Sequence, residues 1–453
     1  MRRAVALLLI SCIVLLAVPM QIGFGQQKKA PEDYMWGINV FHPFSVPSMQ
    51  TVGEFDHDVP NLLSDGHVGW VRFNIKWRDI MPRERWGIIP GQSDPVWTPY
   101  DTMITALREK GIKLLAIVAC GQIDMVSKDP TEVGPDEYIR VAGELTRAIV
   151  ERYKDKISIW QIENEVNAWS GHASLLFRFR NVSDSYWLNP TQNGFREQLM
   201  ETLYRSVKAA DENAKVAVAI HYGAWAGEIV GYHEAYIPKN YDILGLTIYS
   251  HYMNIIPPIL TPLQVAADYV KNAIKFAEAN GRPIIVVETG FPSGDFGVQR
   301  NSYWTQDGQR SFVSAFVDEA MDHTNVIIGF FYFKFRDTNP PGFSVSIGSQ
   351  AQEDFFGLIN YQGQPKLAWP SYGQKIVEYT PIKPAEVLLP YTWLVVPVVV
   401  AAIALAILVT RRRRKRPQTP PTNVVEAFVY CINCGRPLPQ FASYCSSCGS
   451  KQK

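Results

Sequence analysis

Two stretches of this chain pair an apolar run with a glutamate at its end. Residues 159–165 read Ile-Trp-Gln-Ile-Glu-Asn-Glu, and residues 284–293 read Ile-Ile-Val-Val-Glu-Thr-Gly-Phe-Pro-Ser. Short apolar runs rich in β-branched residues predict buried strands. Parallel barrels carry their functional side chains at the carboxyl ends of such strands. Glu165 and Glu288 are therefore the first candidates for a site.

Eight short apolar runs of strand type alternate with amphipathic segments along most of the chain. The predicted strands are 35–40, 70–75, 113–118, 157–162, 215–220, 243–248, 283–287 and 326–333. The predicted helices are 100–110, 136–153, 194–212, 262–280 and 308–323. This alternation predicts a parallel sheet, and eight strands predict a closed (β/α)8 TIM barrel over residues 32–380. The alternative is an open doubly wound sheet, but no glycine-rich phosphate loop follows an early strand.

Both ends of the chain predict passage through a membrane. Residues 1–25 begin Met-Arg-Arg and continue with an apolar run, which is typical of a secretory signal peptide. Residues 387–410 are apolar and uncharged over a length that predicts a transmembrane helix, and Arg411 begins a basic run typical of the cytoplasmic side. The prediction is a single-pass cell-membrane protein with an extracellular barrel and a cytoplasmic tail. The alternative is a buried core helix followed by a nucleic-acid-binding run.

The charge is distributed unevenly along the chain. The net charge is +1, but Lys and Arg are concentrated in the tail after residue 410, so the body before it is mildly acidic. An acidic body argues against nucleic acid or another polyanion as its ligand. Neutral sugars and peptides both remain compatible with this balance.

The tail ends in two pairs of cysteines behind a basic, proline-rich linker at 411–427. Within residues 428–450 the pairs are Cys431 with Cys434, and Cys445 with Cys448. Two Cys-x-x-Cys pairs in so short a segment predict a structural zinc ribbon, in which Zn²⁺ supplies most of the folding free energy. The alternative is four free thiols in a disordered tail. The segment resembles the small zinc ribbons appended to many prokaryotic membrane proteins, and a cytoplasmic protein partner is one role for it.

The glutamate pair suits one kind of chemistry in particular. Cleavage of a glycosidic bond needs one carboxylic acid to protonate the departing oxygen and one carboxylate to attack or support the sugar carbon. The acid must hold its proton near neutrality, which burial and a neighbouring negative charge promote. The nucleophile must stay ionised, and Arg72 and Tyr249 are candidates to supply a guanidinium and a hydroxyl beside it.

On these motifs the chain resembles the retaining glycoside hydrolases of clan A, which are built on the eightfold barrel. Asn164-Glu165 matches the motif after strand four, and Glu288 followed by Thr-Gly-Phe-Pro-Ser is similar to the motif that ends strand seven. The resemblance implies no catalytic cofactor and these roles: Glu165 as acid/base, Glu288 as nucleophile, Asn164 as donor to the sugar 2-hydroxyl, Arg72 as support for the nucleophile, and Tyr249 as its hydrogen-bond partner. The chain departs from the pattern at Thr247, where many relatives have histidine, and at 331–334, where tryptophan is common.

Some assignments stay open at this level. Glu163 shares the side-chain parity of Glu165 and is an alternative catalytic residue. His221, Trp77 and Trp169 either line a cleft and bind substrate or pack beneath it. The leading prediction is a membrane-anchored, extracellular retaining glycoside hydrolase that cleaves β-glycosidic bonds of an oligo- or polysaccharide by double displacement. The alternative is a catalytically inactive glycan-binding surface receptor that recruits a partner through its ribbon. Sugar, linkage, endo or exo action and oligomeric state are not determined by these patterns.

Overall fold

The chain divides into two compact units, Met1–Pro381 and Ile382–Lys453, and each is described by itself. The computed structural model describes residues 29–40, 59–119, 128, 130–168, 194–222, 237–249, 260–294, 302–337, 354–381, 428–440 and 442–451. The predicted signal peptide, transmembrane segment and linker lie outside these residues.

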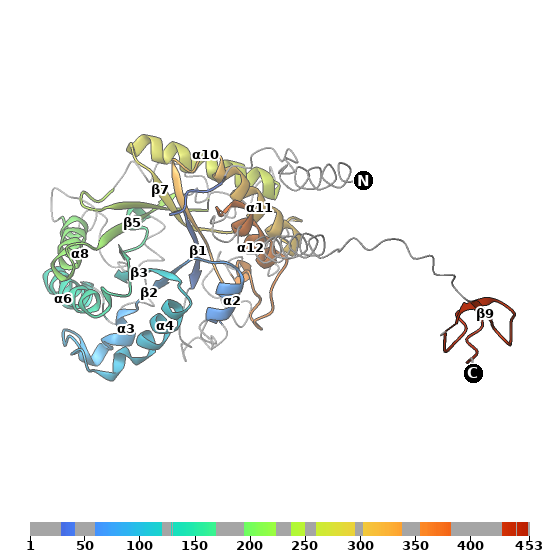
Figure 1. The fold of residues 1–453 in the computed structure, drawn as a ribbon. Helices are drawn as coiled ribbons and strands as arrows, with labels where there is room; N and C mark the ends of the chain where they lie inside the picture. Colours follow the sequence, from blue (N-terminus) through green and yellow to red (C-terminus); the bar gives the residue numbers. More distant parts are fainter. Residues whose placement is uncertain are drawn as a thin grey trace, which may run out of the picture. The chain divides into compact units, whose positions relative to one another are not determined.

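Eight parallel strands close into a barrel in the first unit, in the order in which they occur in the chain (Figure 1). The strands are β1 Met35–Val40, β2 Trp70–Asn74, β3 Lys113–Ala119, β4 Ile159–Ile162, β5 Lys215–Tyr222, β6 Ile243–Ile248, β7 Ile284–Thr289 and β8 Ile327–Tyr332. Because β8 pairs with β1, the sheet has no edge, and the open-sheet alternative is wrong. The predicted (β/α)8 barrel is confirmed.

Helices follow the strands and pack around the barrel (Figure 1). They are α2 Val59–Asp65, α3 Trp77–Ile80, α4 Thr98–Glu109, α5 Pro130–Val133, α6 Pro135–Tyr153, α8 Phe195–Ala210, α10 Pro262–Asn280, α11 Gln306–Met321 and α12 Ala368–Tyr379, with 3₁₀ turns at Arg83–Arg85, Pro95–Trp97 and Val166–Ala168. Helix α10 shows why local sequence predicted its bounds. Thr261 and Gln264 form a capping box at its start, and Gly281 takes the left-handed conformation at its end.

The inside of the barrel is filled by side chains from its own strands. The interior cluster consists of Met35, Trp70, Leu115, Ile159, Ala217, Ala219, Ile285, Val287 and Phe331. Phe331 occupies space that Gly37 on the neighbouring β1 leaves open, since a Cβ on Gly37 would meet the Phe331 ring at 2.2 Å. This layer closes the barrel beneath the carboxyl ends of the strands, where the polar residues lie.

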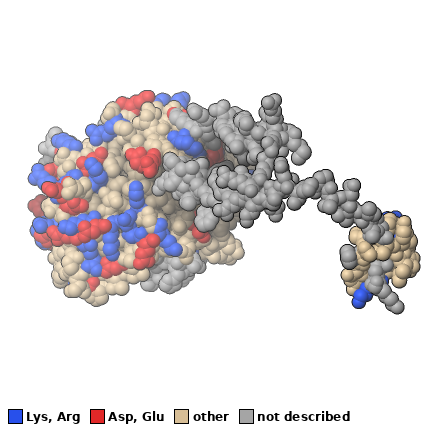
Figure 2. Space-filling model, in the orientation of Figure 1, with Lys and Arg blue, Asp and Glu red and all other residues tan. Residues whose placement is uncertain are grey.

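The prediction of a single-pass membrane protein is corrected by the structure. In the parts of the chain described above, no helix is both long enough and apolar enough to cross a bilayer. The longest described helices, α6 and α10, have 19 residues each but are amphipathic. Helix α6 carries ion pairs on its outer face, such as Arg140 with Glu144, and Figure 2 shows basic and acidic side chains interspersed over the visible face of the barrel.

The second unit contains a small antiparallel pair of strands, β9 Phe428–Tyr430 and β10 Pro437–Pro439. Its described core consists of Cys431, Leu438 and Cys445, with Ala442 packed against them. So few apolar side chains bury too little surface to hold a fold on their own, which makes the four cysteines central to this unit.

The packing of the barrel interior predicts a large loss of stability for Phe331→Ala. The substitution leaves a cavity that the closed barrel cannot collapse, so we expect the free energy of unfolding to fall by about 3–5 kcal/mol. Val377→Ala on α12 is the control, because Val377 is 51% exposed and should change stability by less than about 0.5 kcal/mol. Urea denaturation measures both, and equal effects of the two substitutions would contradict this packing.

Candidate active site and metal centre

Arg72 on β2 is the hub of a buried polar network at the carboxyl ends of the strands. Its guanidinium donates to four side-chain oxygens that come from three other strands and one loop. The acceptors are Gln161 Oε1 at 2.8 Å, Asn39 Oδ1 at 2.6 Å, Glu288 Oε1 at 2.5 Å and Asn164 Oδ1 at 2.8 Å. Only 2% of the Arg72 side chain is exposed, so these charge-assisted bonds replace its hydration shell.

A bulge in β7 turns Glu288 into the barrel. Alternation would point Glu288 outward, because Val287 lies in the interior cluster. Between the pairs Val286 with Phe330 and Thr289 with Tyr332, however, β7 contains one residue more than β8. The pairing with β6 shifts at the same place. The extra residue lets two successive side chains, Val287 and Glu288, both face inward, as bulges beside active sites do.

Glu288 lies in an ion pair with aromatic side chains around it. Tyr249 donates its hydroxyl to Oε2 of Glu288 at 3.4 Å, while Arg72 holds Oε1. The Tyr249 ring stacks on Phe356 at 5.9 Å and meets Phe333 edge-on at 6.1 Å. Burial raises the pKa of Glu288 above its ordinary value, and the charge of Glu165 adds to this, while Arg72 opposes both.

Glu165 lies in the loop after β4, in a strained segment of backbone. Glu163 and Glu165 have φ angles of 56° and 50°, in the left-handed region that favours glycine. Such strain persists only where the surroundings impose it, and it is common at functional sites. Here Oε1 of Glu165 accepts from the Thr247 hydroxyl at 2.6 Å and lies 3.0 Å from Nδ1 of His221.

The partners of Glu165 decide its charge. Burial favours the neutral acid, but His221 and Thr247 stabilise the carboxylate more strongly, so the pKa of Glu165 lies below its ordinary value. Burial also disfavours a charged His221, yet the Glu165 carboxylate raises the pKa of His221 above its ordinary value. The pKa of Glu165 is thus shifted in the direction opposite to the one that burial alone would produce, because His221 and Thr247 lie beside the carboxyl.

The network fixes the orientation of the Asn164 amide. Its Oδ1 accepts from Arg72 and, at 3.0 Å, from Nε2 of Gln161. Because Oδ1 faces the donors of Arg72 and Gln161, Nδ2 of Asn164 points away from them. The arrangement is compatible with the donor role that the resemblance implies for Asn164.

The structure adds residues that the sequence analysis did not select. Asn39 bonds Arg72 and donates Nδ2 to the Val287 carbonyl at 2.9 Å, which ties β1 to the bulge in β7. Gln161 and Thr247 are further buried polar residues, and they contact Arg72 and Glu165, respectively. A polar side chain inside an otherwise apolar strand costs free energy unless it has partners, and this pattern at Asn39 and Gln161 was available in the sequence.

The remaining candidates lie in different places. Trp77 is fully buried, donates its indole N–H to the Val118 carbonyl and packs its ring 5.8 Å from Tyr138 of α6, so it supports the barrel wall. Trp169 lies outside the described residues. Glu163, the alternative to Glu165, is 0% exposed, whereas 15% of the Glu165 side chain is exposed.

The loop after Glu288 is held by a second buried network. Lys366 donates to Asp337 Oδ1 and to Ser293 Oγ, each at 2.7 Å, and to the Phe355 carbonyl at 3.2 Å. Burial lowers the pKa of Lys366 to about 8, although Asp337 opposes the shift. Gly290 lies at the start of this loop, where a Cβ would meet the Phe333 carbonyl oxygen at 2.2 Å. The loop that follows Glu288 is thus tightly packed against the segments that contain Phe333 and Lys366.

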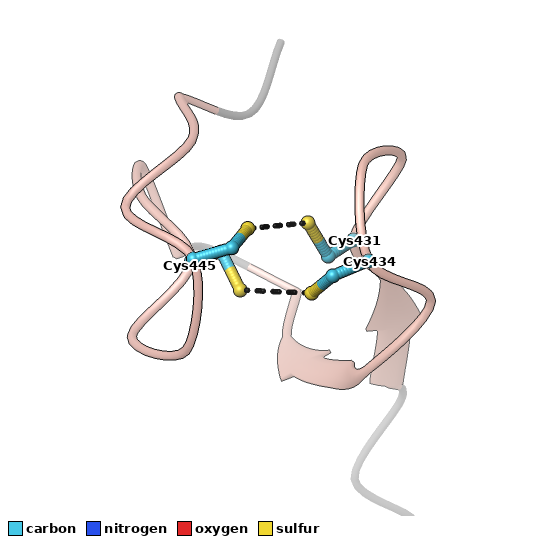
Figure 3. A group of neighbouring side chains, drawn as sticks. Cys431, Cys434 and Cys445 are labelled. Carbon is cyan, nitrogen blue, oxygen red and sulfur yellow. Dashed lines mark hydrogen bonds between the residues drawn. The ribbon is translucent and has the colours of Figure 1, made fainter.

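Four cysteine thiols converge in the second unit (Figure 3). The sulfurs of Cys431, Cys434, Cys445 and Cys448 all lie within 4.8 Å of one another, and the cysteines are free. The distances Cys431 to Cys448 and Cys434 to Cys445 are 3.7 and 3.6 Å. A tetrahedral Zn²⁺ with Zn–S bonds of about 2.3 Å requires sulfurs about 3.8 Å apart, so the donor set fits a metal of this type.

The two cysteine knuckles have the same backbone geometry. Gly435 and Gly449, each directly after the second cysteine of its pair, have φ angles of 69° and 70°. Their N–H groups donate to the carbonyls of Cys431 and Cys445, in both cases at 2.8 Å. Each knuckle therefore needs glycine at this turn, and the repeated geometry directs both thiols of each pair to one point.

Comparison with known proteins supports the fold. No family model and no curated protein matches the sequence. Among solved structures, a β-glucosidase from Thermotoga maritima in complex with deoxynojirimycin has a TM-score of 0.56 at 15% identity, covering 79% of this chain and all of that one. The β-glycosidase BGL167 has a TM-score of 0.53 at 15% identity, covering 78% and 98% of the two chains. At this identity the likeness establishes that the chain shares the (β/α)8 barrel fold of these proteins.

Proposed function

We propose that the barrel is a retaining glycoside hydrolase that cleaves β-glycosidic bonds by double displacement. The observation that carries the proposal is the pair of carboxyl groups in contrasting surroundings: Glu288 bonded to Arg72 and Tyr249, and Glu165 bonded to His221 and Thr247. Two carboxyls with separate partners suit separate roles in glycoside cleavage. The structural neighbours named as β-glucosidases make a β-linked sugar the substrate class of choice.

In this proposal Glu288 attacks the anomeric carbon of the sugar. Arg72 and Tyr249 hold one carboxylate oxygen each, which orients the group and favours its ionised form. The bond between the sugar and the leaving oxygen breaks as the bond to Glu288 forms, and Glu165 protonates that oxygen. Glu165 then takes a proton from the water that releases the sugar from Glu288, which restores both groups.

We further propose that the four cysteines hold a structural Zn²⁺. Cysteine thiolates are the ligands that zinc prefers in closed structural sites, and four of them leave no open position for catalysis. Bound zinc supplies cross-links that the small described core of this unit lacks. The barrel chemistry, which needs only carboxyl groups, uses no metal.

The two carboxyl roles predict different losses for two matched variants. Glu288→Gln should abolish turnover of every glycoside, because the nucleophile is gone. Glu165→Gln should lower kcat/KM, which reports the first step, by about 10² to 10⁴-fold for substrates with poor leaving groups and much less for activated aryl glycosides, because only the former need an acid in that step. Values of kcat/KM for paired substrates measure both variants. A panel of activated fluoro-sugars with mass mapping should label Glu288, and labelling of no residue across the panel would overturn the retaining mechanism.

The Arg72–Glu288 ion pair predicts the direction of a pH shift. Arg72→Met removes the charge that holds down the pKa of Glu288, so the acidic limb of kcat/KM should move to higher pH by about one unit. Arg72→Lys keeps the charge without the planar fork, so its limb should lie between wild type and Arg72→Met. Circular dichroism confirms folding of each variant. A limb that moves to lower pH in a folded Arg72→Met protein would contradict the assignment of Glu288.

The cysteine centre predicts a stoichiometric metal. The purified chain should contain one zinc ion, released by a chelator and absent from Cys434→Ser, as measured by elemental analysis. Ser446→Ala, in the neighbouring knuckle, removes a hydroxyl that is no ligand and should keep the zinc. Zinc loss should make the second unit sensitive to protease, since metal binding supplies its folding free energy. Full zinc content in Cys434→Ser would contradict the four-cysteine site.

A further inference from the structure

His221 and Thr247 lie side by side beneath the carboxyl of Glu165. They are paired residues on neighbouring strands, β5 and β6, and Thr247 pairs in turn with Glu288 on β7. Both contacts that the described residues make to the Glu165 carboxyl fall on Oε1, from Thr247 at 2.6 Å and from Nδ1 of His221 at 3.0 Å. Oε2 is therefore the oxygen that we expect to face a substrate.

The position of His221 is fixed to the loop that carries Glu165. Asn167, in the 3₁₀ turn directly after Glu165, accepts from the His221 backbone N–H and donates to the His221 carbonyl, both at 2.8 Å. Asn167 is 2% exposed and His221 8% exposed. The imidazole and the carboxyl are thus held together by backbone as well as by their own contact.

The charged groups around this pair balance one another. Among the described residues, the charge of Glu288 also acts on His221, and the charge of Arg72 also acts on Glu165. Arg72 and Glu288 form an ion pair at 2.5 Å, so their charges largely offset each other. A buried site disfavours net charge, which leaves Glu165 and His221 most stable when together they are neutral.

We propose that Glu165 and His221 hold one dissociable proton between them, and that His221 is a positioning residue that stores the proton Glu165 donates to the leaving group. This inference rests on the glycosidase function proposed above. The Nδ1–H to Oε1 hydrogen bond is present in both neutral forms of the pair. In the resting form the proton is on Nε2 of an imidazolium beside a carboxylate, and in the donating form it is on Oε2 of Glu165 beside a neutral imidazole.

Protons and electron pairs are conserved in the donation step. Conversion of the resting form removes a proton from Nε2 and adds one at Oε2, with no change in net charge. In the reaction the Oε2–H bond breaks and a bond from that proton to the glycosidic oxygen forms. The electron pair of the broken sugar–oxygen bond stays on the leaving oxygen while Glu288 bonds to the sugar carbon. Glu165 is then a carboxylate that Thr247 and His221 continue to stabilise.

The shared proton is tested first without any substrate. In the full-length chain labelled at histidine Cε1 with ¹³C, the His221 resonance is the one absent from His221→Asn. Its NMR titration should give a pKa above the ordinary histidine value of about 6.5, and Glu165→Gln should move it below that value, because burial then acts without the carboxylate. Titration of His221 below about 6.5 in the wild-type chain would overturn the proposal.

Kinetics test the use of the stored proton. His221→Asn can still donate a hydrogen bond but cannot ionise, so the basic limb of kcat/KM should move to lower pH by roughly one unit. Thr247→Val is the matched control, because Thr247 and His221 both contact Oε1 of Glu165. It removes a donor that stabilises the carboxylate, so its basic limb should move to higher pH.

The outcomes separate the two proposals. A basic limb that does not move in folded His221→Asn, or that moves up as in Thr247→Val, would overturn the role of His221. Absence of hydrolysis by the wild-type chain across a glycoside panel would overturn the proposed function and the donation step with it. The NMR titration would still decide whether Glu165 and His221 share a proton.

Discussion

The buried guanidinium of Arg72 is the constraint around which the rest of the site is organised. A charge with 2% of its side chain exposed is tolerated only where hydrogen bonds replace water, and Asn39, Gln161, Asn164 and Glu288 provide these acceptors. The acceptors belong to β1, β4, the loop after β4, and β7. One side chain thereby couples strands that are distant in sequence, and loss of any acceptor would leave part of a buried charge without a partner.

The same constraint separates the two glutamates. Glu288 forms an ion pair with Arg72, whose donors are already bonded to other acceptors. The hydrogen bonds to the Glu165 carboxyl therefore come from other residues, His221 and Thr247. Each carboxyl then belongs to a nearly neutral pair, which a low-dielectric site favours. The two pairs differ in kind, because a guanidinium keeps its proton at all ordinary pH values whereas an imidazolium can release one. In the proposed mechanism this difference distinguishes the nucleophile from the acid.

The two units of the chain illustrate two ways of encoding a site. The cysteine centre is local: each knuckle brings two thiols and a glycine turn within a few residues, so spacing alone predicts the thiol cluster that the structure contains. The barrel site is assembled from β1, β2, β4, β5, β6, β7 and the loop after β4, and no short motif contains it. Predictions for the first kind of site need only local geometry, while the second requires the register of the whole sheet.

The sequence by itself determined the element types and the barrel, because apolar runs and capping residues such as Thr261 and Gly281 are local features. It also singled out the polar residues of interest, which are Glu165, Glu288, Arg72, Asn164 and Tyr249. Only the tertiary structure decided which partners these residues have. The bulge that turns Glu288 inward beside Val287 breaks the alternation on which strand patterns rely, and the left-handed backbone at Glu165 has no local signature. The partners of Glu165 were also beyond the sequence, because they depend on which groups the closed barrel brings within 3 Å of one carboxyl oxygen.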